Sequence, residues 1–348
     1  MNDINAIGLM SGTSLDGVDV ALCRFYNNPV KYEIISTHTF PYPCGIKTKL
    51  EDATKLSGSD LNKLHIELGQ LYGELVSIFI QSFSIKKVDL IASHGHTIFH
   101  EPKKQITLQI GHPAYIAIIS GIQTIADFRS SDVFLGGQGA PLVPIGDQNL
   151  FSNYKNRLNL GGFANVSFEK DDTTIAFDIC PANIPLNLIA DKMGYFYDDE
   201  GLLAASGKTD PVLLEELNDL EYYKGKAPKS LGREWFNQQF WTLIKKSKSS
   251  NIDKLRTITE HIAQQCANSF IKGNVLITGG GTHNTFLIDR IKDLSTNQII
   301  IPDKTLIDYK EALIFAYLGY LRINQKNNTI SSVTGAQKAH SSGAIYLP

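Results

Sequence analysis

One order of predicted elements occurs twice along this chain of 348 residues, and it constrains the fold more than any other feature. In each half, three short strands joined by tight turns precede a helix and another strand. The first copy predicts strands at 6–10, 18–22 and 32–38, a helix at 58–83 and a strand at 88–93. Alternation of apolar and polar residues indicates the strands, and apolar residues spaced by three and four indicate the helix.

The second copy begins in mid-chain and shares the pattern of the first copy but not its sequence. Its strands are expected at 157–160, 166–168, 173–178 and 275–278, and its helices at 183–192, 235–245, 255–272 and 307–323. A duplicated unit of this kind is the arrangement of the actin-like ATPases, which bind nucleotide in a cleft between two domains. We therefore expect an α/β, two-domain actin-like ATPase fold, that is, a duplicated ribonuclease-H-like fold with an inter-domain nucleotide cleft.

The same repeat predicts where the chain divides into domains. We expect an N-terminal actin-like domain at 1–130 and a C-terminal actin-like domain at 131–348, with the last residues packing back on the first domain. The segment 128–145, rich in glycine, serine and aspartate, is the expected crossing between the two halves.

Composition excludes several classes of partner. The formal net charge is -2 at pH 7, which gives no basic surface for nucleic acid. No apolar stretch approaches the roughly 20 residues that a membrane-spanning helix requires. The four cysteines form no C-x-x-C pair, and the first residues lack a signal-peptide pattern. These features predict a cytoplasmic enzyme without nucleic-acid or membrane partners.

A glycine-rich turn after the first expected strand predicts a phosphate-binding loop. Its glycines let the backbone approach a ligand closely, and successive turn amides bind anions. Carboxylates beside a bound phosphate require a divalent cation or its waters between them. A plain hairpin turn is the alternative. The residues expected to bind the ATP phosphates are Gly12, Thr13, Ser14, Leu15, Asp16, Gly17, Val18 and Asp19.

Two further glycine-rich turns lie in the second half. One forms the hairpin tip that corresponds to the first turn, and the other follows a strand and opens a helix, where backbone amides bind phosphate. Ordinary turns are again the alternative. The expected nucleotide contacts are Gly161, Gly162, Asn165, Gly279, Gly280, Gly281 and Asn284. The chain has neither a P-loop nor a G-x-G-x-x-G turn.

Asp178 is the candidate general base. It ends an expected strand and precedes the stretch 179–183 and a helix. A carboxylate at the carboxyl end of a strand faces the ligand in folds of this type, and such groups are good candidates for proton transfer. The alternative is that Asp178 caps the helix that follows.

The segment ADFRSSDVFLGGQGAP, residues 126–141, suits recognition of a polar sugar because Asp, Arg and Gln stand beside flexible glycines. Arg129 is the natural partner for a substrate carboxylate. An Arg–Asp ion pair that pins a loop is the alternative. The expected substrate-binding residues are His96, Thr97, Arg129, Asp132, Gln138 and Asn183.

Taken together, these segments resemble the anhydro-N-acetylmuramic acid kinases of bacteria. The matching segments follow the family's order and cover nearly the whole chain. They are GLMSGTSLDGVDVAL, ASHGHTIFHEP, TLQIGHPAYIA, ADFRSSDVFLGGQGAPLVP, LNLGGFANVSF, FDICPAN, the DDEG run at 198–201, LITGGGTHN, DYKEALIFAYLG and VTGAQKAHSSGAIY. The first segment and the ADFR…GGQGAP block are highly specific, since neither is a generic kinase motif.

The resemblance implies a kinase dependent on ATP and Mg²⁺ that opens the 1,6-anhydro ring of anhydro-N-acetylmuramic acid with water and phosphorylates the freed 6-oxygen. The product would be N-acetylmuramic acid 6-phosphate, in peptidoglycan recycling. Asp178 would activate the water, and Asp16 and Glu311 would serve the metal. The resemblance also implies a cytoplasmic homodimer.

Three alternatives stay open. After the catalytic aspartate the family pattern reads close to Thr-Gly-Pro-Gly-Asn, whereas Cys180 and Ala182 stand here. One alternative is therefore a related actin-fold sugar kinase that phosphorylates an ordinary hydroxyl of another amino sugar. A second is an ATPase of the same fold that binds protein partners. A third is a zinc hydrolase that uses His94 and His96, because side chains two residues apart in extended chain point the same way.

Overall fold

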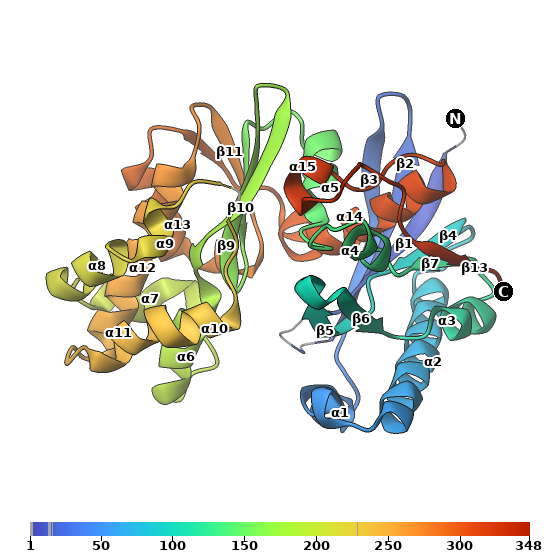
Figure 1. Cartoon of the computed structure of the whole chain (residues 1–348), viewed down its shortest axis with the longest axis horizontal. Helices are drawn as coiled ribbons and strands as arrows, with labels where there is room; N and C mark the ends of the chain where they lie inside the picture. Colours follow the sequence, from blue (N-terminus) through green and yellow to red (C-terminus); the bar gives the residue numbers. More distant parts are fainter. Residues whose placement is uncertain (1–2, 13–14, 16, 228) are drawn as a thin grey trace. The chain divides into compact units, whose positions relative to one another are not determined.

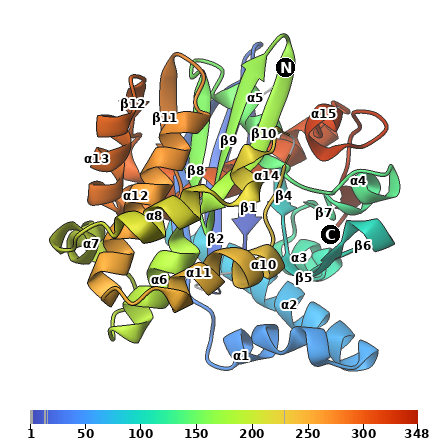
Figure 2. The same cartoon turned by 60° about the vertical axis from the view of Figure 1, so that its left-hand side comes forward.

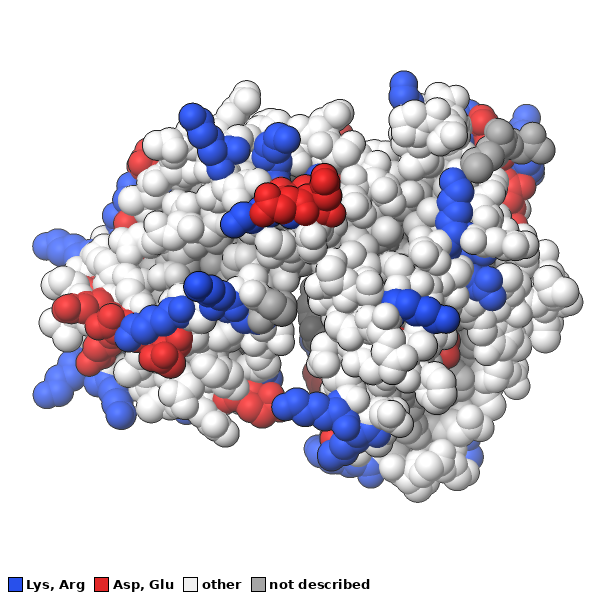
Figure 3. Space-filling model, turned by 45° about the horizontal axis from the view of Figure 1, so that its top comes forward, with Lys and Arg blue, Asp and Glu red and all other residues white. Residues whose placement is uncertain are grey.

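The computed structural model describes residues 3–12, 15, 17–227 and 229–348. The chain divides into two compact units (Figure 1), Met1–Leu150 with Tyr309–Pro348 (unit 1) and Phe151–Asp308 (unit 2). Within the described ranges, no helix has both the length and the apolar character needed to cross a membrane. On the face shown in Figure 3, acidic and basic side chains are interspersed, and neither sign forms a continuous patch.

Unit 1 is built on a six-stranded sheet with the order β13-β7-β4-β1-β2-β3. Its strands are β1 (Ile4–Met10), β2 (Val18–Tyr26), β3 (Lys31–Phe40), β4 (Leu90–Ser93), β7 (Thr124–Ala126) and β13 (Ala344–Tyr346), and β5 (His96–Glu101) pairs separately with β6 (Ile106–Ile110). Its helices are α1 (Ile46–Glu51), α2 (Gly58–Ser82), α3 (Pro113–Ser120), α4 (Ser130–Phe134), α5 (Val143–Leu150), α15 (Ser331–Thr334) and most of α14 (Lys304–Ile323).

The longest helix of unit 1, α2, shows why these residues fold as they do. The Ser57 hydroxyl accepts a hydrogen bond from the Asp60 N–H and caps the first turn. The apolar stripe predicted from the sequence is buried in the core of the unit together with β1 and β2. Gly69 lies on the same face, where a Cβ atom would be 2.5 Å from the His112 carbonyl oxygen, so α3 packs closely against α2.

Unit 2 has a five-stranded sheet with the order β10-β9-β8-β11-β12. Its strands are β8 (Asn156–Leu160), β9 (Phe163–Lys170), β10 (Thr173–Pro181), β11 (Asn274–Thr278) and β12 (Gln298–Ile300). Its helices are α6 (Asn183–Lys192), α7 (Leu202–Ser206), α8 (Pro211–Asn218), α9 (Glu221–Lys224), α10 (Arg233–Trp235), α11 (Trp241–Lys246), α12 (Asn251–Ser269) and α13 (Thr285–Leu294). The helices α12 and α13 lie side by side (Figure 2) and contribute buried residues to the core of the unit.

The two units repeat one topology. In unit 1, β3-β2-β1 is antiparallel and β4 and β7 continue the sheet in parallel with β1. In unit 2, β10-β9-β8 is antiparallel and β11 and β12 continue it in parallel with β8. This confirms the predicted duplicated ribonuclease-H-like fold of the actin-like class.

The expected domain boundary between residues 130 and 131 falls inside unit 1. Two helices that follow it pack there, because Asp147 on α5 forms a buried ion pair of 2.7 Å with Lys310 on α14. A Cβ atom on Gly146 would lie 2.7 Å from the Ile314 side chain, which again places α5 against α14. The chain therefore leaves unit 1 after α5 and returns to it within α14.

Candidate active site

The predicted turns of unit 2 meet at one edge of its sheet. The strands β8, β10 and β11 all run in the same direction, so their carboxyl ends share an edge. The turn after β8, the turn after β11 and the end of β10 therefore lie at the edge where folds of this type bind ligands.

Asn183, the first residue of α6, lies against both glycine-rich turns of unit 2. Its N–H donates to the Gly161 carbonyl (3.1 Å), and its Nδ2 donates to the Leu160 carbonyl (3.1 Å). A Cβ atom on Gly281 would lie 2.8 Å from Asn183 Oδ1, so the second turn can approach only with glycine at this position. Asn183 thus hydrogen-bonds to the first turn and packs closely against the second, and its contact with substrate stays a prediction.

The turn after β11 has a backbone suited to a phosphate. Gly279 has a φ of 87°, and a Cβ atom there would lie 2.5 Å from Asn159 Oδ1. The Thr282 hydroxyl is buried and has no hydrogen-bond partner among the residues that the structure describes, so a donor is available beside the turn. Thr282 was not among the predicted nucleotide contacts, although it stands within the TGGGTHN motif. Asn284 Oδ1 caps α13 by accepting from the Leu287 N–H (2.9 Å), and its contact with nucleotide stays a prediction.

Asp178 lies inside β10 and not at its end, which corrects the predicted end of the strand. The ladder with β9 continues to Pro181, and its register shifts between Asp178, which pairs with Asn165, and Cys180. Ile179 is therefore an extra residue in a β-bulge. A bulge bends its strand and changes the direction of the neighbouring side chains, so the bulge at Ile179 helps to set the direction of the Asp178 side chain.

A segment about fifty residues further along the chain contacts both the backbone and the carboxyl of Asp178. The Leu231 N–H donates to Oδ2 at 2.9 Å, the Lys229 carbonyl accepts from the Asp178 N–H at 3.2 Å, and the Tyr222 hydroxyl donates to the Asp178 carbonyl. Burial raises the pKa of Asp178, and the Leu231 hydrogen bond partly opposes this shift. A carboxylate with a raised pKa and one oriented oxygen is suited to accept a proton. Nothing in the local sequence around Asp178 indicated these three partners.

The two glycine positions of the family pattern that are replaced here face the core of unit 2. Cys180 and Ala182 are both fully buried. Burial and the neighbouring thiol of Cys266 raise the pKa of Cys180, as expected for an inert packed cysteine. The replaced side chains are therefore not exposed to a ligand at the edge of the sheet.

In unit 1, Arg129 lies three residues after the end of β7, and its guanidinium hydrogen-bonds to neutral groups. Its Nε and Nη2 donate to Nε2 of His94 (3.2 and 2.8 Å), and its Nη1 donates to the Gly139 carbonyl (2.7 Å). Burial lowers the pKa of Arg129 to about 10, while the charges of Glu311 and Asp132 oppose the shift. Within the described part of the chain no carboxylate forms an ion pair with this cation. A half-buried guanidinium in this state is suited to an anionic ligand.

Asp132 is fully buried, and both of its carboxylate oxygens have partners. Oδ2 accepts from the Gly139 N–H (2.7 Å) and Oδ1 accepts from the Thr334 hydroxyl (2.8 Å). These contacts hold the loop around Arg129, but among the described residues Asp132 forms no direct ion pair with Arg129, which the alternative required. Gln138 donates its N–H to the Thr334 carbonyl (2.7 Å), and its own side chain is exposed.

The two histidines of the HGH motif are both hydrogen-bonded within the protein. His94 accepts from Arg129, and burial lowers its pKa well below the usual value. His96 Nδ1 lies 2.9 Å from the Ser11 hydroxyl, and burial lowers its pKa as well. Thr97 accepts from Gln109 Nε2 at 3.3 Å. No group of three His, Cys, Asp or Glu residues in the described ranges is placed to hold a metal ion, so nothing favours the zinc alternative.

The first glycine-rich turn is described only in part. Its predicted residues Thr13, Ser14 and Asp16 lie outside the described residues. The Leu15 N–H donates to the Gly12 carbonyl (3.3 Å), and Gly17 has a φ of 155° where a Cβ atom would lie 2.2 Å from the Phe40 carbonyl oxygen. Val18 is buried in the core at the start of β2, so only its backbone faces the turn.

Asp19 and Glu311 are two carboxylates of unit 1 whose charges interact. Asp19 accepts from the Thr39 hydroxyl at 2.6 Å. Burial raises the pKa of Glu311, Arg129 and Lys310 lower it, and the like charge of Asp19 raises it again. Mg²⁺ is usually bound by one or two carboxylates together with water and substrate phosphates. The donor set therefore fits Mg²⁺ without a third protein carboxylate.

The duplicated fold, with its glycine-rich turns and shielded carboxylate, is that of an ATP-dependent sugar kinase of the actin-like class. The family model "Anhydro-N-acetylmuramic acid kinase" matches residues 4–348. Proteins named anhydro-N-acetylmuramic acid kinase are 38% identical in Coxiella burnetii (98% of this chain, 96% of the relative), 36% in Mannheimia succiniciproducens (98% and 98%) and 34% in Sulfurovum sp. (100% and 100%). The chain belongs to the anhydro-N-acetylmuramic acid kinase family, which confirms the family and enzyme class predicted from the sequence.

Proposed function

We propose that this kinase opens 1,6-anhydro-N-acetylmuramic acid with water and phosphorylates the freed 6-oxygen, with Asp178 as the general base. The product is N-acetylmuramic acid 6-phosphate, an intermediate of peptidoglycan recycling. One contact supports the role of Asp178 above all others: the Leu231 N–H donates to Oδ2 at 2.9 Å and orients a carboxyl whose pKa is raised by burial.

The proposed step balances in atoms and charge. Asp178 takes a proton from water, and the water oxygen bonds to the anomeric carbon as the bond from that carbon to the 6-oxygen breaks. The 6-oxygen receives the electron pair and attacks the γ-phosphorus of ATP, and ADP leaves. Ring opening thus creates the phosphoryl acceptor, so positioning and charge neutralisation account for the remaining catalysis.

Backbone amides of the glycine-rich turns are proposed to bind the ATP phosphates. In unit 2 these are Gly161, Gly162 and the turn 279–281, with the buried Thr282 hydroxyl as an added donor. In unit 1, Asp19 and Glu311 would hold Mg²⁺, which would supply charge neutralisation at the phosphates.

Arg129 is proposed to bind the carboxylate of the lactyl group that distinguishes this sugar from other anhydro amino sugars. Its described hydrogen-bond partners are neutral, and no carboxylate of the described residues forms an ion pair with it, so it can pair with the carboxylate of the substrate. His96, Thr97 and Gln138 remain proposed contacts with the sugar, whereas the contacts of Asp132 favour a positioning role. We also propose that the protein is a cytoplasmic homodimer whose partners are small molecules only.

The alternative of an ordinary hydroxyl acceptor was motivated by Cys180 and Ala182, and both lie in the core. Substituting Asp178→Asn tests the main proposal. Turnover of the anhydro sugar should be lost while ATP binding, measured by calorimetry, is kept. Turnover at the wild-type rate in the Asp178→Asn protein would refute the assigned base.

A further inference from the structure

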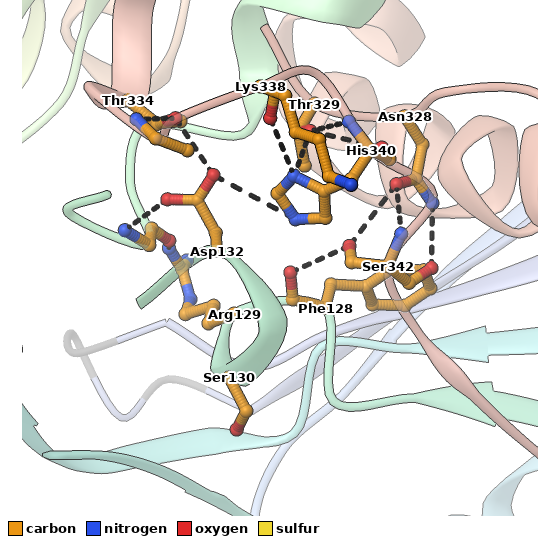
Figure 4. Close-up of polar contacts among 12 residues, drawn as sticks. Phe128, Arg129, Ser130, Asp132, Asn328, Thr329, Thr334, Lys338, His340 and Ser342 are labelled. Atoms are coloured by element: carbon orange, nitrogen blue, oxygen red, sulfur yellow. Dashed lines mark hydrogen bonds and ion pairs between the residues drawn. The ribbon is translucent and has the colours of Figure 1, made fainter. Parts of the chain in front are cut away.

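The C-terminal residues 328–342, here called the C-terminal strap, lie across the loop 128–139 within unit 1 (Figure 4). Three hydrogen bonds join the strap to the ends and the middle of this loop. They run from Ser342 Oγ to the Phe128 carbonyl (2.8 Å), from the Gln138 N–H to the Thr334 carbonyl (2.7 Å) and from the Gln337 N–H to the Leu135 carbonyl (3.0 Å). The strap corresponds to most of the VTGAQKAHSSGAIY motif, to which the proposed chemistry assigns no role.

The strap is itself held in one conformation by Asn328, whose side chain is fully buried. Asn328 Nδ2 donates to the carbonyls of Leu318 (3.2 Å) and Ser342 (2.9 Å), and its Oδ1 accepts from the Ser342 N–H (2.7 Å). Such a fully satisfied buried amide joins the strap to α14 and fixes the contacts that it makes with the loop.

A continuous chain of hydrogen bonds leads from the strap to the guanidinium of Arg129. The Thr334 hydroxyl donates to Asp132 Oδ1 (2.8 Å), and Asp132 Oδ2 accepts from the Gly139 N–H (2.7 Å). The carbonyl of the same glycine accepts from Arg129 Nη1 (2.7 Å). Asp132 and Thr334 are 0% and 1% exposed, so neither is available to bind a ligand directly.

We propose that Thr334 and Asp132 are positioning residues that fix Arg129 for recognition of a carboxylate on the sugar. This inference rests on the proposed function, in which Arg129 binds that carboxylate. A bidentate pair requires the planar guanidinium in one orientation, and a carbonyl held in place at Nη1 supplies part of that constraint. Gly139 links Asp132 to Arg129, and this position requires glycine. Its backbone has a φ of 67°, and a Cβ atom there would lie 2.8 Å from the Val133 side chain.

The test compares Thr334→Val, which removes the hydroxyl at nearly constant shape, with Thr334→Ser, which restores it. Thr334→Val should raise the KM for the anhydro sugar by about tenfold, the effect of losing one hydrogen bond to a charged group. The KM for ATP should not change, and Thr334→Ser should recover the wild-type KM. The matched control is Thr259→Val, which removes a fully buried hydroxyl on α12 of unit 2 that donates to the Leu255 carbonyl (2.9 Å), and its sugar KM should stay at the wild-type value.

A double-mutant cycle separates failure of this inference from failure of the proposed function. In an Arg129→Gln background, Thr334→Val should have no further effect on the sugar KM. An undiminished effect there, or equal losses in the two Thr→Val proteins, would overturn the positioning role. An unchanged sugar KM in Arg129→Gln alone would instead overturn carboxylate binding by Arg129. If Thr334→Val does not fold, Asp132→Asn serves as the relay variant with the same expected result.

Discussion

Replacing Leu231 with proline removes the backbone N–H that donates to Asp178 Oδ2 at 2.9 Å, because proline carries no such hydrogen. This N–H favours the ionised carboxylate and so opposes the effect of burial on the pKa of Asp178. Its loss should therefore raise that pKa further, and a larger fraction of the base will be protonated at any pH on the acid side of the optimum.

The size of the effect follows from the strength of the lost bond. A hydrogen bond to a charged group contributes about 1.5–3 kcal/mol, and each 1.36 kcal/mol corresponds to a tenfold change in rate. The value of kcat/KM on the acid limb should therefore fall by about ten- to a hundredfold. The loss should shrink at higher pH, where Asp178 is ionised in both proteins and only its orientation differs.

The assay is the pH profile of kcat/KM for the anhydro sugar at saturating ATP and Mg²⁺. Leu231→Ala is the matched control, because it removes the side chain and keeps the N–H. Circular dichroism should show that both variants are folded, and an amide-to-ester replacement at residue 231 removes the donor without a proline ring. Superimposable pH profiles for the proline and alanine variants would refute the assignment of this N–H to the base.

Three further outcomes are expected from the packing and charges. Asp178→Asn should raise the melting temperature at neutral pH and lose this advantage as the pH falls through the folded-state pKa, because burial penalises the ionised carboxyl. Lys310→Met should lower the free energy of unfolding by about 3–5 kcal/mol in urea titrations because it breaks the buried ion pair with Asp147, and adding Asp147→Leu should restore much of it. Gly8→Ala should destabilise by at least about 1–3 kcal/mol, since its Cβ would lie 1.8 Å from a carbonyl oxygen of α14, whereas Gly58→Ala, with open space around it, should not.

The fold was predictable wherever local patterns were strong. The helix α6 occupies the predicted range 183–192, and the strand order of each meander follows from hairpins between neighbouring segments. The predicted helix at 235–245 is interrupted by a π-helical turn, Phe236–Phe240, which the spacing of apolar residues does not reveal. The strands β7, β12 and β13 have three residues each, which is too short for an alternation of apolar and polar residues to be recognised. They are defined by pairing with segments that are distant in the sequence.

The candidate site divides in the same way. The turn glycines and Arg129 could be predicted from the sequence because glycine-rich turns after strands are typical phosphate-binding sites and arginine is a typical partner of carboxylates. The partners that decide how the other polar groups are used come from distant segments. Thr334 contacts Asp132 from about two hundred positions away, and Leu231 contacts Asp178 from about fifty. The bulge that presents Asp178 likewise depends on the register with β9, which no local pattern encodes.

The most direct test of the coupled reaction is the mass of the product formed from 1,6-anhydro-N-acetylmuramic acid, ATP and Mg²⁺. The account predicts a gain of one phosphate and one water for each ADP released, and no product from the Asp178→Asn protein. A product that gains phosphate alone, with its anhydro ring intact, would contradict the coupling of ring opening to phosphoryl transfer.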